Sequence, residues 1–321
     1  MKKLLNELRW LVKDDLVKYD LQLNASLKSD VKLINTIVNY IISRKGKSFR
    51  PILCFLATRL FGSPNDKTYI AASLLEIIHV ATLLHDDVVD ESDYRRGWPS
   101  VNRVWKNKLS ILVGDYMFSK SLVNMVEINE SKLFHILSKT AEKLSSGEIM
   151  QLESSFKYSL SEKKYFEIIS NKTASLFSAS CTVGIATISN EEEQIKNMEK
   201  FGNLLGLCFQ IKDDLLDIMG SIDGMGKPLN LDVKKNLFTL PLIHVIENVS
   251  NADAQKIKHL IKRNNTKELK KIIILNNGID YAENKIKEFS DKAVNLLDSL
   301  GSSSYKKALI NALKFNLERV H

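Results

Sequence analysis

Glycine and proline are scarce in this chain, which has 13 glycines and 5 prolines among 321 residues. Average usage is about 7% glycine and 5% proline, so these turn-forming residues have roughly half of their expected share. Few turns favour long helices. No segment alternates convincingly with the period of a β-strand, and no linker is long enough to separate domains. The sequence therefore predicts an all-α fold in a single domain over residues 1–321.

Several other signatures are also missing. The three cysteines, Cys54, Cys181 and Cys208, lie far apart in apolar runs without metal-ligand spacing, which predicts reduced, buried thiols. No run reaches the ~18 apolar residues of a membrane span, and the N-terminus lacks a cleavable signal, so we expect a cytoplasmic protein. The net charge is +8, yet no zinc, ribonucleoprotein or basic-zipper pattern is present, and we expect no nucleic-acid partner.

The segment from Glu76 to Gly97 carries an apolar helix directly into a carboxylate cluster and then into two arginines. At the helical period His79, Asp86 and Asp90 lie along one face, and Asp87 lies about 100° from Asp86. Carboxylates this close repel one another unless a positive charge lies between them, and a divalent metal ion is the simplest candidate. A solvated helix end is the alternative, and it is the commoner case for an isolated acidic cluster.

A second acidic cluster is harder to explain as solvated surface. Residues 201–209 are apolar almost all round, which predicts a buried helix. It is followed on one side by Gln210, Asp213, Asp214 and Asp217. Carboxylates that continue a buried helix should be paired or metal-bound. If the two acidic helices face each other across a bundle, six carboxylates share one cavity. Ligands that are all oxygen favour Mg²⁺, with Mn²⁺ as an alternative, and suit an ion that bridges carboxylates to substrate phosphates.

Basic residues accompany both clusters. Lys47 and Arg50 precede a helix expected to begin at Pro51, and cations beside the free N–H groups of a helix start form an anion site. Further cations are Arg95, Arg96, Lys172 and Lys227. Taken singly these signals are weak, because Lys172 could be a surface lysine and the Gly-Lys pair at Lys227 a simple turn. Beside carboxylates that hold a metal, they suit a bound diphosphate.

These motifs together resemble the trans-isoprenyl diphosphate synthases, also called polyprenyl synthetases. The family's first aspartate-rich motif is matched by Asp86-Asp87-Val88-Val89-Asp90 with Arg95-Arg96-Gly97, and its second by residues Gln210 to Asp217. Further matches, in the family's order, are Gly46-Lys47-Ser48-Phe49-Arg50-Pro51, His79 in Glu76-Ile77-Ile78-His79, Gly114-Asp115-Tyr116, Lys172-Thr173 and Gly226-Lys227-Pro228. The matches cover residues 44–241, whereas the later tail agrees only in being helical.

The resemblance implies an isoprenoid-synthase-type bundle of long, mostly antiparallel helices around a central active-site cavity. It also implies a Mg²⁺-dependent prenyltransferase that joins isopentenyl diphosphate, head to tail, to an allylic prenyl diphosphate, with three ions expected when diphosphate is bound. By the same resemblance we expect a homodimer. A weak membrane association would suit release of a greasy product.

The resemblance also implies residue roles. Isopentenyl diphosphate would be bound by Lys47, Arg50, His79 and Arg96. The allylic diphosphate would be bound by Arg95 and by four residues that are also the expected catalytic groups, Lys172, Thr173, Gln210 and Lys227. Mg²⁺ would be held by Asp86, Asp90 and Asp213, with Asp87, Asp214 and Asp217 as supporting or outer ligands. Since released diphosphate can itself take the proton, no side chain is expected to act as the general base.

One position departs from the family pattern Gly-Lys-x-Thr-Leu-Pro. This chain reads Asn236-Leu237-Phe238-Thr239-Leu240-Pro241, so Leu237 replaces a lysine that helps to hold the allylic diphosphate. Lys234 or Lys235, nearly one turn earlier, could substitute for it. The departure affects the expected affinity for the allylic substrate more than the chemistry.

Product length depends on the residues one helical turn before the metal ligands. Ala81 and Thr82 lie five and four positions before Asp86, where the growing chain must pass. In the family a bulky aromatic residue here stops elongation early, whereas both side chains are small and Ile78 continues the wall without an aromatic plug. This predicts a long product, hexaprenyl to decaprenyl, as in a quinone side chain.

Three alternatives stay open. A short-chain farnesyl or geranylgeranyl diphosphate synthase would share the fold and the motifs. A non-catalytic partner subunit that binds prenyl diphosphate would typically have lost an aspartate motif, and this chain keeps both. A terpene cyclase would have no need of the basic stretch at residues 46–51.

Overall fold

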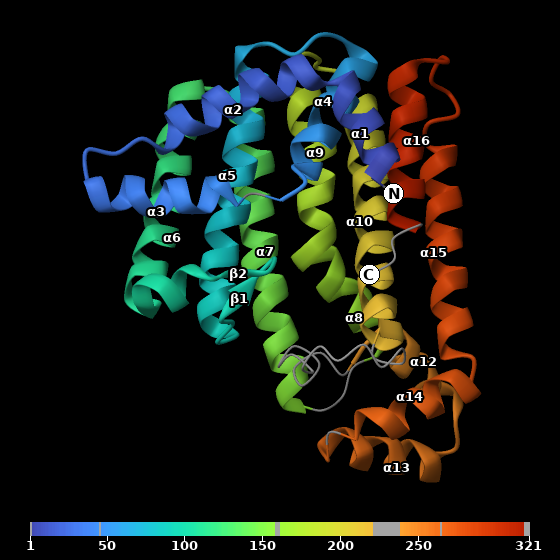
Figure 1. Cartoon of the computed structure of the whole chain (residues 1–321). Coiled ribbons are helices and arrows are strands. Elements are labelled where there is room, and N and C mark those ends of the chain that lie inside the picture. The colour runs from blue at the N-terminus through green and yellow to red at the C-terminus, as the bar shows by residue number, and fades with distance from the viewer. Residues whose placement is uncertain (1, 45, 158–160, 221–237, 264, 318–321) are drawn as a thin grey trace.

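The structure, a computed structural model, describes residues 2–44, 46–157, 161–220, 238–263 and 265–317. Long helices dominate it (Figure 1), which confirms the all-α prediction. In chain order the elements are α1 (Lys2–Leu11), α2 (Lys13–Leu27), α3 (Lys32–Ser43), α4 (Phe49–Phe61), α5 (Asp66–Val89), β1 (Tyr94–Arg95), β2 (Trp98–Pro99), α6 (Val101–Ile128), α7 (Ser131–Lys157), α8 (Glu162–Ile169), the π-helix η1 (Ser170–Ala174), α9 (Ser175–Ala186), α10 (Glu192–Gly220), α12 (Leu240–Asn248), α13 (Asn251–Lys262), α14 (Thr266–Leu275), α15 (Gly278–Asn295) and α16 (Ser304–Leu317).

Helix α5 is the central helix of the first half of the chain. It begins with a capping box in which Asn65 accepts from the backbone N–H of Thr68 and the Thr68 side chain accepts from the N–H of Asn65. This reciprocal pair satisfies two N–H groups that a helix start leaves without intrahelical partners. By length and composition α5 is the one helix of the described chain that could cross a membrane, but 67% of the apolar window is buried inside the protein. A long helix in the core of a protein has the same length and apolar composition, and the burial of α5 fits that case.

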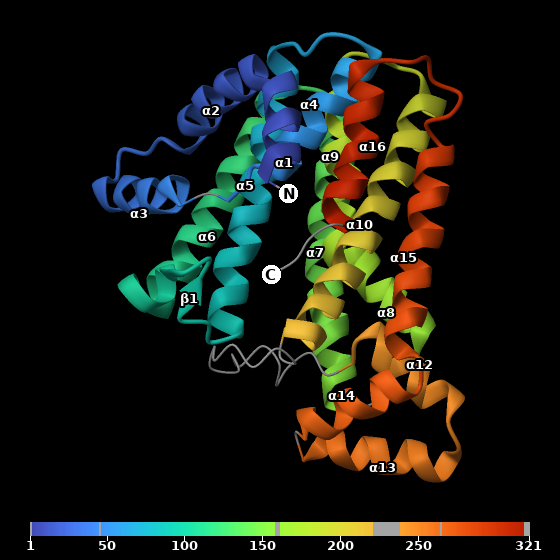
Figure 2. The ribbon, with the colours of Figure 1, turned by 45° about the vertical axis from the view of Figure 1, so that its right-hand side comes forward.

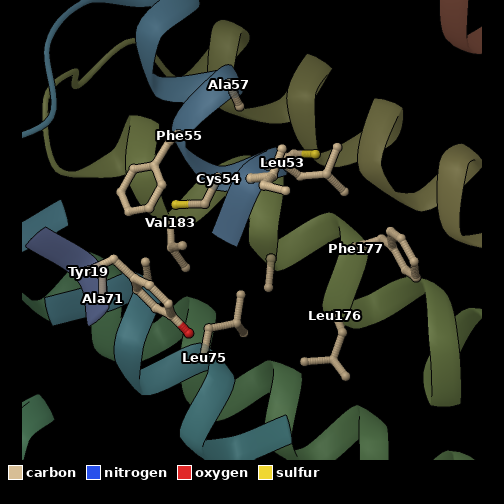
Figure 3. Packing of buried hydrophobic residues seen from close by; sticks show 14 of the residues in the cluster. Tyr19, Leu53, Cys54, Phe55, Ala57, Ala71, Leu75, Leu176, Phe177 and Val183 are labelled. Atoms are coloured by element: carbon tan, nitrogen blue, oxygen red, sulfur yellow. The ribbon is translucent and has the colours of Figure 1, made fainter. Parts of the chain in front are cut away.

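The helices pack around one large core. Helices α4, α5, α7, α9 and α10 run side by side, α2, α3 and α6 cover one flank, and α15 and α16 cover the other (Figures 1 and 2). Figure 3 shows part of this core, where Tyr19, Phe55 and Leu75 pack close to Cys54. The three cysteines are free and buried, as the sequence predicts. Burial raises the pKa of the Cys54 and Cys208 thiols to about 12.

The structure corrects the sequence-based helix assignments in three places. Apolar residues at helical spacing predict one opening helix over residues 3–23, but it breaks at Val12 into α1 and α2. The sequence also predicts one continuous helix from near Glu162 to Ile188, which is interrupted by the π-helix η1. The strands β1 and β2 were not predicted, since two residues are too few to show a period. They form a hairpin whose turn residues Arg96 and Gly97 both have positive φ, 54° and 80°, as a tight two-residue hairpin requires.

Candidate active site

The carboxylate-bearing ends of α5 and α10 both lie at the lower end of the bundle in Figures 1 and 2. Helix α7 and the π-helix η1 contact each other between them, with α7 against α5 and η1 against α10. Residues from α5, α7, η1 and α10 therefore come together at one end of the bundle, although they are widely separated along the chain.

Asp86 lies on the side of α5 that faces α7 and η1. Its pKa is raised to about 6, chiefly by burial and then by the nearby Glu148, while Lys172 and Arg95 act in the opposite direction. Lys172, from η1, forms an ion pair with Glu148 of α7 at 2.6 Å. Asp90 is a further electrostatic neighbour of Asp86. This group combines two expected metal ligands with the expected allylic-diphosphate lysine, and Glu148 is an additional member that the sequence did not indicate.

Asp87 points away from this group. It is 3% exposed and forms an ion pair with Arg95, with Nη2 to Oδ1 at 2.6 Å. The two residues line a mainly apolar cavity on the α2, α3 and α6 side of α5. The ion pair neutralises the buried charge of Asp87 and links the end of α5 to the first hairpin strand.

A third group of residues lies at the start of α4. Arg50 donates from Nη1 to His79 Nε2 at 2.8 Å, and because a guanidinium only donates, this nitrogen of His79 is the acceptor. Burial, with Arg50, Arg96 and Arg95 adding to it, holds the pKa of His79 well below its ordinary value. The imidazole is therefore neutral near pH 7. The Nε of Arg50 is buried and has no hydrogen-bond partner among the described residues.

Arg96 reaches this group across the hairpin. Its guanidinium packs on Gly46, where an added Cβ would lie 2.6 Å from the Cζ of Arg96. A larger residue at this position would displace the guanidinium from its present place. Lys47 is exposed, and its Nζ lies 5.4 Å from the centre of the Phe315 ring. Ser48 has a positive φ of 52° and makes no side-chain cap to α4. The first N–H groups of α4 are thus not capped by this residue, beside Arg50.

The second acidic cluster forms a hydrogen-bonded chain. Thr173 Oγ1 donates to Gln210 Oε1 at 2.7 Å, and Gln210 Nε2 donates to Asp214 Oδ1 at 2.9 Å. Tyr165 Oη donates to Asp214 Oδ2 at 2.7 Å. The pKa of Asp214 is raised to about 7, because burial outweighs the opposite effect of the bonds from Tyr165 and Gln210. These four residues and Lys172 line one cavity of about 90 Å³.

The remaining expected site residues lie as follows. Asp213 is half-buried, Asp217 is exposed, and both are electrostatic neighbours of Asp214. Lys227, Leu237 and the lysines at 234 and 235 lie outside the described residues. Phe238 and Thr239 are described, and both line the same cavity as Thr173.

The chain-length positions lie on α5 above Asp86. Ala81 and Ile78 are buried. The hydroxyl of Thr82 donates to the backbone oxygen of His79 at 2.8 Å, so its hydrogen is directed to its own helix. None of the three side chains is aromatic.

The carboxylates fit a divalent cation in their chemistry. Their oxygens are hard donors, and the raised pKa values of Asp86 and Asp214 show buried acid groups whose charge is not fully compensated. Within the described residues, however, no three His, Cys, Asp or Glu side chains gather closely enough to hold a metal by themselves. Such a donor set suits a cation that is shared between a few carboxylates and a bound phosphate.

The fold and the site thus define an all-helical protein with separate anion-binding and carboxylate groups at one end of its bundle. The family model described as polyprenyl synthetase matches residues 31–276. An octaprenyl diphosphate synthase from Haemophilus influenzae is 34% identical over 98% of this chain and 97% of its own length.

Two solved structures are similar over nearly their whole length. A decaprenyl diphosphate synthase from Rhodobacter capsulatus is 30% identical with a TM-score of 0.91, and 99% of each chain is covered. A polyprenyl synthase from Caulobacter crescentus CB15, complexed with calcium and isoprenyl diphosphate, is 31% identical with a TM-score of 0.88, covering 99% of this chain and 98% of that one. The chain belongs to the polyprenyl synthetase family, and it is an enzyme of the trans-prenyl diphosphate synthase type.

Two polar residues at the site were missed in the sequence. Glu148 lies within the long helix α7 as one of many charged residues, and Tyr165 precedes the Lys172-Thr173 pair by two helical turns. The spacing of seven between Tyr165 and Lys172 places them on a similar helix face and was the one available signal.

Proposed function

We propose that this chain is a Mg²⁺-dependent prenyltransferase that condenses isopentenyl diphosphate with an allylic prenyl diphosphate into a long all-trans polyprenyl diphosphate, a precursor of the quinone side-chain type. The observation that carries this proposal is the separation of two cationic groups at one end of the bundle. Arg50, His79 and Arg96 form one group, and Lys172 forms the other beside Asp86 and Glu148. Two separate anion sites suit two diphosphate substrates.

The group at α4 is proposed to bind isopentenyl diphosphate. A buried guanidinium with an unpartnered Nε, beside the first N–H groups of a helix, favours an anion. Lys47, exposed at the entrance, would add a mobile cation. A neutral His79 can donate from Nδ1 without adding a charge that would repel Arg50.

The group at η1 is proposed to bind the allylic diphosphate. Lys172, Thr173 and Gln210 line the same cavity as Asp214. Lys227, Arg95 and the other carboxylates of the two clusters complete the proposed set, with Asp87 as an outer group through its ion pair with Arg95. Mg²⁺, when bound by Asp86, Asp90 and Asp213, would neutralise the diphosphate and make it a better leaving group. Lys172 can pass from Glu148 to a phosphate oxygen, so its positive charge is available as the leaving group becomes more negative.

In the proposed reaction the bond between C1 of the allylic chain and its diphosphate oxygen breaks, and the double bond of isopentenyl diphosphate supplies the electron pair for the new carbon–carbon bond. A proton is then lost to the released diphosphate. Phe177 lies with its ring centre 5.4 Å from the Cζ of Arg50 and packs against Phe209 with 5.0 Å between the ring centres, and this pair would exclude water from the carbocation. Water exclusion matters because water would otherwise capture the cation.

Chain length is proposed to be long because Ala81, Thr82 and Ile78 carry no aromatic plug. A short-chain synthase of the same fold is the alternative that only product analysis separates. A non-catalytic partner subunit is less well supported, because both carboxylate clusters are present.

The quaternary structure is proposed to be a homodimer formed through α6. This helix exposes a stripe of large apolar side chains, at Ile111, Leu112, Phe118, Leu122, Val123 and Val126. A contiguous exposed apolar surface of this kind suggests a protein interface. We further propose one domain over residues 1–321, a cytoplasmic location and a weak membrane association during product release.

The test is one incubation of the purified protein with labelled isopentenyl diphosphate, farnesyl diphosphate and Mg²⁺, with product length determined by reversed-phase chromatography. The expected products are hexaprenyl to decaprenyl diphosphates, and chelation of the metal should abolish them. Products no longer than geranylgeranyl diphosphate would support the short-chain alternative. Absence of any elongated product, with prenyl diphosphate still bound, would support the partner subunit.

A further inference from the structure

Tyr165 is a buried residue of α8 to which no role has been assigned. It is 3% exposed, and its ring packs edge-on against Phe166 at 5.4 Å between ring centres. Its hydroxyl donates to Oδ2 of Asp214, on the facing helix α10, at 2.7 Å. The ring is held by packing, so the hydroxyl is presented to the carboxylate in a defined position.

The bond from Tyr165 completes the hydrogen bonding of Asp214. The other oxygen, Oδ1, accepts from Gln210 Nε2 at 2.9 Å, so both carboxylate oxygens have a donor from the protein. With one donor on each oxygen, the carboxylate is restrained in its rotation about the Cβ–Cγ bond. Asp214 is 9% exposed, and water has little access to replace either donor.

The fixed position of the Asp214 carboxylate in turn orients Gln210 and Thr173, two residues of the proposed allylic site. Gln210 directs its NH₂ group to Asp214 and its Oε1 to Thr173, which is the orientation that an ionised Asp214 requires, because an ionised carboxylate only accepts. The hydroxyl of Thr173 must then donate to that oxygen. Tyr165 of α8 therefore orients the Gln210 amide and the Thr173 hydroxyl through its bond to Asp214.

We propose that Tyr165 is a positioning residue, which orients the Asp214 carboxylate and, through it, Gln210 and Thr173 for binding of the allylic diphosphate and its metal ions. The inference rests on the proposed function and adds to it the residue that organises one of its two sites. Outer partners of metal ligands typically change metal affinity or activity by about 10- to 100-fold when they are removed.

The test compares Tyr165→Phe with Tyr281→Phe, which removes another tyrosine–carboxylate bond at α8. Tyr281 Oη bonds Glu162 at 2.7 Å, and neither residue lines the cavity at Thr173. For Tyr165→Phe we expect KM for farnesyl diphosphate to rise about tenfold, with KM for isopentenyl diphosphate and the Tm unchanged. Tyr281→Phe should leave both KM values unchanged.

A second readout does not depend on turnover. Mn²⁺ binding, followed by electron paramagnetic resonance in the presence of unreactive farnesyl thiodiphosphate, should weaken about tenfold in Tyr165→Phe. In an Asp214→Asn background, the further change Tyr165→Phe should have no additional effect. A lower Tm with unchanged Mn²⁺ affinity and unchanged KM values would mean a purely structural role and overturn the inference. A wild-type protein without elongation activity would instead overturn the proposed function.

Discussion

His79 is a buried histidine whose electrostatic neighbours are three arginines, and this surrounding explains how one residue can serve a cationic site without adding charge. Burial and the arginines lower its pKa, so the imidazole accepts from Arg50 in its neutral form. Arg50 itself has a buried Nε without a partner in the described chain. At the residue scale, the site therefore combines an N–H donor without a partner, Arg50 Nε, with a histidine that stays neutral. This combination favours binding of an anion.

The lowered pKa of His79 predicts how the free energy of unfolding depends on pH. Above about pH 6.5 the histidine is neutral in both states, whereas below it the unfolded chain takes up a proton that the folded chain resists. Stability is thus lost as pH falls from 6.5 towards the folded pKa. Urea unfolding between pH 5 and 7.5 should show that His79→Gln reduces this loss by up to about 1.4 kcal/mol per pH unit. His135→Gln, at an exposed position of α7, is the matched control. Equal slopes in wild type and His79→Gln would contradict the prediction.

Ala81 makes a prediction about product length. Its side chain is 1% exposed, and a tyrosine there would project towards the path proposed for the growing chain. Ala81→Tyr should shorten the products by several isoprene units, as measured by reversed-phase chromatography of the labelled products. Thr82→Phe is a second variant at a less buried neighbouring position, in case the first variant does not fold. Wild-type product lengths from both folded variants would rule out this wall as the stop for elongation.

At the scale of elements, the π-helix η1 is the feature that brings α8 and α9 into position against α10. One turn with π-helical hydrogen bonding replaces a regular turn between Ser170 and Ala174, and such turns often occur at functional sites. It carries Lys172 and Thr173. Two glycines allow the close approach: Gly147 of α7 against the backbone of Lys172, and Gly206 of α10 against Ala174. The small residues Ala174, Ser175, Ser178 and Ala179 predict a close approach of helices from the sequence, and the contacts of Gly147 and Gly206 confirm it.

The contact at Gly206 can be tested by overpacking. An added Cβ would lie 2.4 Å from the Cα of Ala174, which is a clash with backbone. Gly206→Val should therefore lower the free energy of unfolding by about 1–3 kcal/mol in urea titrations. Gly301→Ala is the control, since no atom lies within 4 Å of the position that its Cβ would occupy. Its effect should stay within about 0.5 kcal/mol. A neutral Gly206→Val would show that η1 can move away from α10 at no cost.

At the scale of the whole molecule, helix α6 lies on the flank away from α15 and α16 (Figure 2), and it carries the exposed apolar stripe. Val126, exposed by 72%, is its most exposed member, and its neighbour Val123 is exposed by 51%. Most of the other large apolar side chains of α5, α9 and α10 are buried. The contrast favours an interface that covers α6 in solution.

The proposed homodimer predicts the effect of charge on this stripe. Val123→Lys combined with Val126→Lys should shift the protein from dimer to monomer in light scattering coupled to gel filtration, because two buried charges at an interface core are strongly unfavourable. Leu275→Lys, at an 80% exposed position of α14, should leave the mass unchanged. A wild-type monomer, or a variant that stays dimeric, would exclude α6 as the interface.

Much of the fold and of the site's composition was predictable from local pattern. Helix α5 was expected from about Lys67 to Asp90 and is observed over Asp66–Val89, because a long apolar period with a cap and a following turn is local information. The hairpin at Arg95 and Arg96 was missed because two-residue strands have no measurable period. The break of the α8–α9 helix at η1 was missed for a related reason: all its residues are compatible with a regular α-helix.

The sequence by itself determined the all-helical class, the family and the residue types of the site, since helical period and motif spacing are properties of the chain alone. Only the tertiary structure decided which polar groups meet. It paired Asp87 with Arg95, Lys172 with Glu148 and Tyr165 with Asp214, across separations of 8, 24 and 49 positions. The longer of these contacts depend on how helices pack, and packing is set by side-chain shape over the whole core, which no local pattern contains.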